Sequence, residues 1–174
     1  MLFLLVFACA SSGSDSGDTV GAHGHLTQQE VTEVPPGDAQ GEAWTSSYDA
    51  EVRTLTCTGT CGTGASSMLP ASFCDVGDLD YEVFYFAQDD GLLEMEVSDP
   101  ISYYRGGVDA DGTLVMGGYA TDLGGAVELL ALVEGRFTGE LLKGSATASI
   151  LGTVDGQPID CVGTYSVEAV RSDW

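Results

Sequence analysis

The chain has 174 residues and a formal charge of −22, from 27 acidic and five basic residues. A chain of this length forms one domain of ordinary size. So few basic residues exclude a nucleic-acid groove, which needs cations to neutralise phosphates, and a hydrophobic content of 44% excludes disorder throughout.

The first feature along the chain is an apolar run over residues 2–8, followed at once by small residues. The run is much shorter than the roughly 20 residues of a membrane-spanning helix and has the length of a signal-peptide core. The letters V-F-A-C at residues 6–9 resemble the lipobox of bacterial lipoproteins. That resemblance implies a signal peptide over residues 1–8, cleavage after Ala8 and acyl chains on Cys9.

The same resemblance predicts where the protein resides. Ala10 and Ser11 follow Cys9, and in lipoproteins of bacteria with two membranes the absence of Asp at this place implies the outer membrane. A plain secretory signal cut near Ala10, which leaves a secreted chain without an anchor, is the alternative. The expected partners are the membrane, through the lipid anchor, and an unidentified protein or small ligand.

Residues 9–43 are expected to form a disordered acidic linker between Cys9 and a folded domain. The segment is rich in Ser, Gly, Asp and Thr, and its few apolar residues cannot offset the chain entropy lost on folding. It contains His23 and His25. A disordered segment supplies no rigid geometry and no third or fourth ligand, so neither a metal nor a cofactor is expected.

Residues 44–174 have the pattern of an all-β domain, because turn signals interrupt short apolar runs about every 8–12 residues. Asp-Gly pairs at 90–91, 111–112 and 155–156 suit the positive φ angles of tight hairpin turns. Helix formers are frequent at 126–135, where a helix is the alternative to a strand. About eight strands are predicted, over 44–57, 81–88, 92–98, 101–108, 113–121, 126–138, 140–154 and 159–171.

An antiparallel up-and-down meander leaves two exposed edges unless it closes. A closed or nearly closed barrel is therefore predicted, with a two-sheet β-sandwich as the alternative. Glycine pairs at 106–107, 117–118 and 124–125 are expected to be bulges or bends that let the sheet curl. The outline is similar to lipocalin-like barrels, but residues 41–44 read G-E-A-W in place of the G-x-W of that family, so no ligand residues carry over.

Setting Cys9 aside from the five cysteines leaves four, an even number that implies two disulfides in an exported chain. Three connectivities are open. The favoured pairs are Cys61–Cys74, across a short loop, and Cys57–Cys161, which ties the first strand to the last where a barrel would close. A zinc site is the rival interpretation, but the C-x₃-C spacing at residues 57–61 is not that of a zinc knuckle.

No catalytic residue is expected. Residues 44–174 contain no histidine, which removes Ser-His-Asp and Cys-His mechanisms and the usual catalytic zinc sites. The pairs Glu94 with Glu96 and Asp109 with Asp111 are candidates for a hydrolase that uses carboxylates. A polar strand face and a hairpin turn explain these two pairs better.

Two functions of different classes are left. A structural or protein-interaction lipoprotein of the cell envelope is preferred, because nothing in the sequence demands a ligand. The alternative is a binding module for a small ligand, favoured if the barrel holds a cavity of roughly 300 Å³ or more with a few inward polar groups. The aromatic residues that could line such a cavity or an exposed patch are Tyr81, Phe84, Tyr85, Phe86, Tyr103, Tyr104 and Tyr119.

Overall fold

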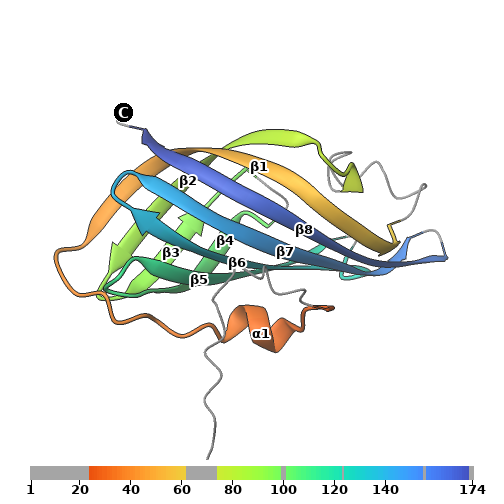
Figure 1. The fold of residues 1–174 in the computed structure, drawn as a ribbon. Coiled ribbons are helices and arrows are strands. Elements are labelled where there is room, and N and C mark those ends of the chain that lie inside the picture. The colour runs from red at the N-terminus through yellow and green to blue at the C-terminus, as the bar shows by residue number, and fades with distance from the viewer. Residues whose placement is uncertain (1–23, 62–73, 99–100, 123, 155, 173–174) are drawn as a thin grey trace, which may run out of the picture.

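The computed structural model describes residues 24–61, 74–98, 101–122, 124–154 and 156–172 (Figure 1). Eight antiparallel strands follow one another in chain order and close into a barrel, because the last strand pairs with the first. The predicted up-and-down barrel is thus confirmed over the sandwich alternative. The strands are β1 (Trp44–Thr60), β2 (Leu79–Asp89), β3 (Leu92–Glu96), β4 (Tyr103–Val108), β5 (Thr113–Asp122), β6 (Val127–Thr138), β7 (Leu141–Val154) and β8 (Gln157–Ser172).

Strand β6 resolves the segment for which a helix was the alternative. It pairs with β5 on one side over residues 127–136 and with β7 on the other over residues 127–138. Leu129, Ala131 and Val133 face the interior, while Leu130 and Leu132 face outward. Tertiary pairing therefore overrides the helix preference of this stretch, as it often does for short apolar runs.

The Asp-Gly turns behave differently from one another. Asp90 and Gly91 have φ angles of 49° and 79°, the two positive values that a type I′ hairpin turn requires. The turn that ends at Gly112 is longer, because the amide of Gly112 donates to the carbonyl of Asp109 and only the glycine has a positive φ, of 88°. Gly156 has a φ of 77°, and Asp155 lies outside the described residues.

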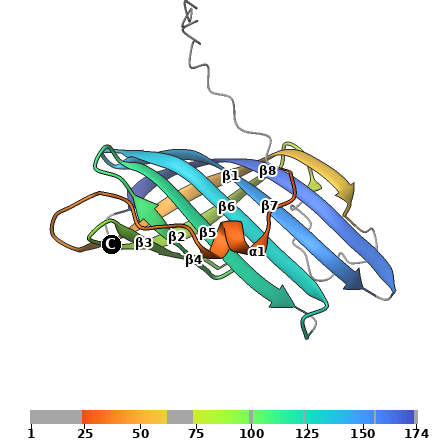
Figure 2. The ribbon, with the colours of Figure 1, turned by 90° about the horizontal axis from the view of Figure 1, so that it is seen from below.

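The prediction of a disordered linker is wrong for residues 24–43, which lie along the outside of the barrel (Figures 1 and 2). Helix α1 (Gln28–Thr32) begins after Thr27, whose hydroxyl accepts a hydrogen bond from the amide of Glu30. The Glu30 carboxylate accepts one from the amide of Thr27 in return, which completes a capping box. Residues 9–23 of the predicted linker, with Cys9, lie outside the described residues.

A small apolar cluster holds α1 against β5 and β6. Leu26 and Val31 are buried against Leu130, which explains the outward apolar residues of β6. A Cβ atom on Gly117 would lie 1.9 Å from the Val31 carbonyl oxygen, so only glycine lets the helix come this close. A few apolar residues are enough to hold this segment in place, because they pack on an apolar surface that the folded barrel already presents.

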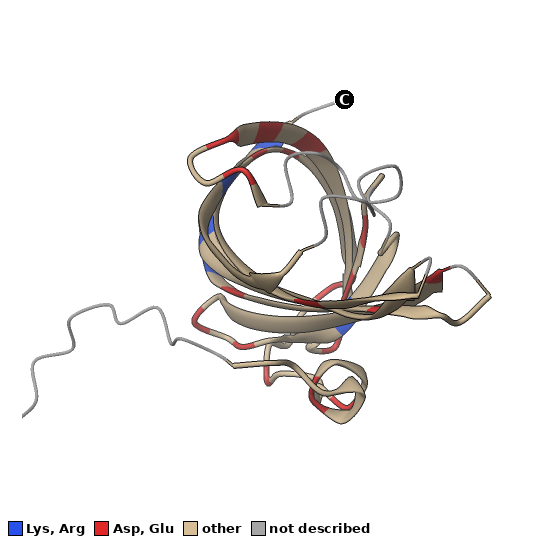
Figure 3. Cartoon of the chain, turned by 90° about the vertical axis from the view of Figure 1, so that its right-hand side faces the viewer, with Lys and Arg blue, Asp and Glu red and all other residues tan. Residues whose placement is uncertain are grey.

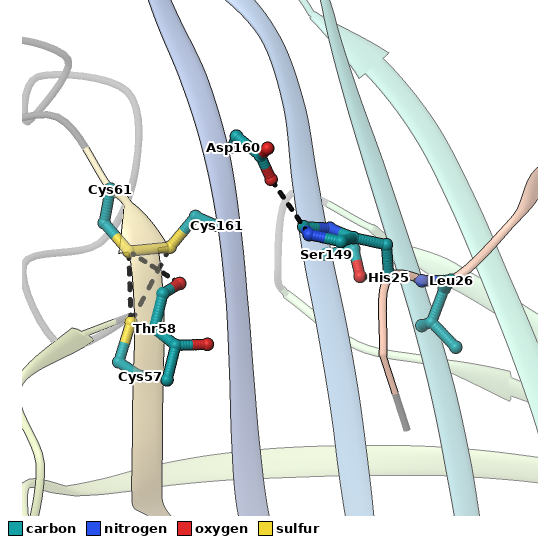
Figure 4. A network of polar contacts seen from close by, with 8 residues as sticks. All are labelled: His25, Leu26, Cys57, Thr58, Cys61, Ser149, Asp160 and Cys161. Atoms are coloured by element: carbon teal, nitrogen blue, oxygen red, sulfur yellow. Dashed lines mark hydrogen bonds and ion pairs between the residues drawn. A yellow bond between two sulfur atoms is a disulfide. The ribbon is translucent and has the colours of Figure 1, made fainter. Parts of the chain in front are cut away.

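Further contacts fix the rest of this segment. The amide of Leu26 donates to the Ser149 hydroxyl at 3.0 Å, and His25 Nε2 lies 3.1 Å from a carboxylate oxygen of Asp160 (Figure 4). Further along, the amide of Gly37 donates to the carbonyl of Gly91 in the β2–β3 turn at 3.0 Å, and that of Ala39 donates to the carbonyl of Val108 at the end of β4 at 3.1 Å. His25 therefore has a structural contact, and His23 lies outside the described residues.

The strand pairing is regular through the glycine pairs at 106–107 and 117–118, so neither pair forms a bulge, one of the two predicted alternatives. Gly107 instead makes room for the N-terminal segment, since a Cβ atom there would lie 2.2 Å from the Gly37 nitrogen. The pair at 124–125 lies in the β5–β6 turn. The sheet shifts register between Thr54 and Thr56 of β1.

Viewed from the side of the molecule, the strands form a ring with α1 outside it (Figure 3). Acidic residues are spread over strands and loops, and basic residues are few. Within the described ranges, no helix combines the length and the apolar character needed to cross a bilayer.

Candidate functional site

A cavity of about 380 Å³ occupies the barrel interior. Its size falls within the range of roughly 300–1,000 Å³ that is typical of small-molecule sites. Most of its wall is apolar, contributed by inward-facing side chains of seven strands and of the β3–β4 connection. The apolar wall residues are Val52, Phe84, Met95, Val97, Ile101, Tyr104, Leu129, Ala131, Val133, Ala146, Ala148, Ile150, Tyr165 and Val167.

Small side chains on β6 and β7 leave this space open. Ala131 of β6 pairs with Ala148 of β7, and Val133 pairs with Ala146, all at inward positions that line the cavity. Large residues at these positions would fill a barrel of eight strands, whose interior is just wide enough for side chains. The alanines therefore create the cavity.

An aromatic cluster closes the interior at the opposite end of the barrel. The Tyr48 and Phe86 rings meet edge to face with centroids 5.4 Å apart, and Phe137 lies 5.4 Å from Phe86. Trp44 packs edge to face on Phe137 at 6.0 Å. Burial in this cluster raises the pKa of the Tyr48 hydroxyl. The interior thus has a filled half and a hollow half.

The rim of the cavity is polar, in contrast to its wall. Asp80 and Glu82 lie at the start of β2, on the same face as Phe84 and Phe86 further along the strand, and Ser98 follows the end of β3. Asp80 and Ser98 are exposed and Glu82 is half-buried, so solvent reaches the cavity here. One strand therefore runs from two carboxylates at the rim to buried aromatic rings at the floor.

The predicted aromatic residues divide by the face of the sheet on which they lie. Phe84 and Tyr104 line the cavity, and Phe86 belongs to the aromatic cluster beneath it. Tyr119 faces outward against the α1 cluster, and its hydroxyl lies 3.4 Å from a carboxylate oxygen of Glu128. Burial, together with the nearby Glu128 carboxylate, raises the pKa of Tyr119. The prediction that Tyr119 lines the interior is wrong, because it is one residue out of phase with inward Gly118.

Three other predicted tyrosines are also outside the barrel. Tyr81, Tyr85 and Tyr103 are 71%, 57% and 44% exposed, and Tyr85 and Tyr103 flank a shallow hollow on the outer face of β1–β4. The Tyr103 hydroxyl donates to Glu94, and burial together with this bond raises the Tyr103 pKa. These three side chains are exposed on the outer face of the barrel. They fit the alternative of an exposed patch and not that of a cavity lining.

The sequence did not single out the residues that make most of the cavity. Ala131, Ala148, Asp80 and Glu82 were not among the candidates. The signal that identifies them is the two-residue period of each strand, counted from a residue that is known to be buried. In β2 that count places Asp80 and Glu82 in line with Phe84.

The disulfides join Cys57 to Cys74 and Cys61 to Cys161, so the predicted pairing is wrong. Figure 4 shows the Cys61–Cys161 bond, with Cys57 beside it. The reason lies in the register of β1 and β8. Cys161 pairs with Gly59, and Cys57 and Cys61 stand two residues to either side of that glycine. Either cysteine is thus near enough to Cys161, and the unbonded Sγ atoms of Cys57 and Cys161 lie 3.6 Å apart. The predicted link between the first and last strands is present, through Cys61.

The four sulfur atoms lie within 4.8 Å of one another. Distance alone would permit a tetrahedral site for a soft metal ion. Metals bind the thiolate, however, and sulfurs paired in disulfides have no thiolate to offer. The four cysteines therefore cross-link the chain covalently where β1 meets β8. Further along the same pair of strands, Val52 and Val167 pair and line the cavity.

The carboxylate pairs considered for a hydrolase lie away from the cavity. Glu94 and Glu96 are on the outer face of β3, and Asp109 and Asp111 are in the β4–β5 turn. The amide of Thr113 donates to Asp111 at 2.9 Å and, with the nearby Arg136 guanidinium, holds the pKa of that carboxyl below its usual value. These contacts stabilise a turn and a strand face.

No protein-family model, curated protein or solved structure matches the chain. The geometry of the cavity and the sequence of the N-terminus are therefore what bear on function.

Proposed function

We propose that the barrel is a binding module for a small, largely apolar ligand, carried by an exported chain that is lipid-anchored through Cys9. The observation that carries the binding role is the cavity of about 380 Å³, with an apolar wall and a polar rim. An interior of this kind gives an apolar ligand a favourable exchange of water for protein contacts, while the rim orients it.

A neutral environment-sensitive dye, N-phenyl-1-naphthylamine, tests the binding role by fluorescence titration. We expect saturable enhancement with the wild-type protein and its loss in Ala148→Leu, which fills the cavity from β7. Tyr85→Ala serves as the matched control, because it alters the outer hollow and leaves the cavity wall unchanged. Dye binding that survives Ala148→Leu and disappears in Tyr85→Ala would contradict the proposal.

The location is proposed from the lipobox-like residues 6–9 and is supported by the disulfides, which form and persist in oxidising compartments. Several acyl chains on Cys9 would anchor the chain stably, since each buried CH₂ contributes about 0.8 kcal/mol. We expect wild-type protein in the outer-membrane fraction and Cys9→Ser in the soluble fraction. Mass spectrometry of the N-terminal peptide separates lipidation from plain secretion, and an unmodified peptide would refute the anchor.

A protein-interaction role is the second candidate function, and the outer face of β1–β4 favours it. Exposed Tyr81, Tyr85 and Tyr103 lie there, and tyrosine is enriched at protein interfaces. This role predicts that Tyr85→Ala together with Tyr103→Ala abolishes capture of an envelope partner by cross-linking, while dye binding to the cavity is unchanged. Capture that persists in this double variant would exclude the tyrosine face.

A further inference from the structure

The two carboxylates at the cavity rim lack counter-ions. Asp80 and Glu82 line the cavity from alternate positions of β2, opposite Val52 and Ala50 of β1. Neither carboxylate has a hydrogen bond or an ion pair with another residue in the part of the chain that the structure describes. Two unpaired carboxylates at the mouth of an apolar cavity attract a cationic group, because the apolar wall beside them screens their charge less than open water does.

Among the residues that the structure describes, no basic side chain supplies such a cation. None of the chain's five basic residues lines the cavity. Three have carboxylate partners elsewhere: Arg105 with Glu94, Arg136 with Asp111, and Lys143 with Glu168. Arg53 lies on an outward position of β1, near the Gly77 carbonyl. Arg171 is exposed near the end of β8, where it pairs with Tyr48 of the aromatic cluster at the end of the barrel opposite the cavity.

Resting on the proposed function, we propose that the ligand is a cationic amphiphile. Its amine or quaternary ammonium group lies at the rim beside Asp80 and Glu82, and its hydrocarbon chain fills the cavity towards Phe84. The net charge of −22 reinforces this choice, because it raises the local concentration of cations and repels anions. The apolar wall thus favours a ligand with a hydrocarbon chain, and the two carboxylates at one end favour a ligand with a positively charged head.

Three probes with the same octyl chain and different heads test the proposal: octylamine, octanol and octanoate. The amine is protonated at pH 7, as a lysine side chain is, and the acid is ionised. The assay measures how well each probe displaces N-phenyl-1-naphthylamine from the purified protein at low salt. We expect octylamine to bind about tenfold more tightly than octanol, octanoate to bind more weakly than either, and added salt to narrow the differences.

The double variant Asp80→Asn with Glu82→Gln should abolish the about tenfold preference for octylamine over octanol. Its matched control is Asp49→Asn with Glu51→Gln, which removes the same charge from outward positions of the neighbouring strand β1. The control should keep most of the preference for octylamine.

The outcomes separate the two proposals. If no octyl probe displaces the dye, the binding role itself falls and the charge preference falls with it. If octanol and octylamine bind equally, or if both double variants lose the preference to the same degree, the binding role stands and the cationic ligand is refuted.

Discussion

Replacing Ala148 with leucine should stabilise the protein, because it places three more carbon atoms in the cavity. Ala148 points inward from β7 beside Ala131 of β6. Each buried CH₂ contributes about 0.8 kcal/mol, so three contribute about 2.4 kcal/mol, and fixing the leucine rotamer costs about 0.5–1 kcal/mol. The expected gain in the free energy of unfolding is about 1.5–2 kcal/mol, or roughly 3–8 °C in Tm.

The same substitution in the filled half of the barrel is the control. Ala169 of β8 is completely buried and pairs with Ala50 across the β1–β8 seam. A leucine there overpacks the interior and should cost about 1–3 kcal/mol. Urea unfolding of both variants measures the two free energies. If Ala148→Leu destabilises the protein as much as Ala169→Leu does, the interior has no usable cavity and the reasoning is refuted.

Three further substitutions test how the barrel is held together. Gly117→Ala should detach α1, because the added methyl would lie 1.9 Å from the Val31 carbonyl oxygen. The rate of amide hydrogen exchange should rise in residues 24–39 and stay unchanged in the strands. An unaltered exchange rate in residues 24–39 would contradict this prediction. Serine replacement of Cys61 and Cys161, which are 100 residues apart, should lower the free energy of unfolding by about 4.7 kcal/mol. Serine replacement of Cys57 and Cys74, which are 17 residues apart, should lower it by about 3 kcal/mol. Equal urea midpoints for the two double variants would contradict this order. Phe137→Ala should cost about 3–5 kcal/mol, because the ring packs against three others in the aromatic cluster, and a loss under 1 kcal/mol would show that the cluster is not tightly packed.

The barrel was predictable because its signals are local and repeated. Alternation such as that of Leu93 and Met95 with Glu94 and Glu96 marks a strand with one buried face. The Asp90-Gly91 turn fixes the register of a hairpin from two residues. Closure follows from the need to remove the exposed edges of a meander.

The docking of residues 24–43 was not predictable in the same way. The segment contributes only a few buried residues, such as Leu26 and Val31, and its composition is that of a linker. What stabilises it is the outer surface of the finished barrel, including Leu130 and the open face at Gly117. A glycine pair in a strand predicts either a bulge or a close approach, and sequence alone does not separate the two.

The disulfide pairing and the cavity depend on register, which is set by long-range pairing. Cys57 and Cys61 flank the partner of Cys161 symmetrically, so spacing along the chain cannot choose between them. The cavity depends on Ala131 and Ala148 meeting at one level of the barrel. No local pattern marks that meeting, because alanine is common at both packed and open positions.

A crystal soaked with 1-bromooctane, a neutral halogenated chain, shows where an apolar ligand binds, because anomalous scattering locates the bromine. We expect a bromine peak inside the barrel, within van der Waals distance of cavity residues such as Phe84, Met95 or Leu129. A well-ordered peak at the outer hollow beside Tyr85 and Tyr103, with no peak in the interior, would contradict it.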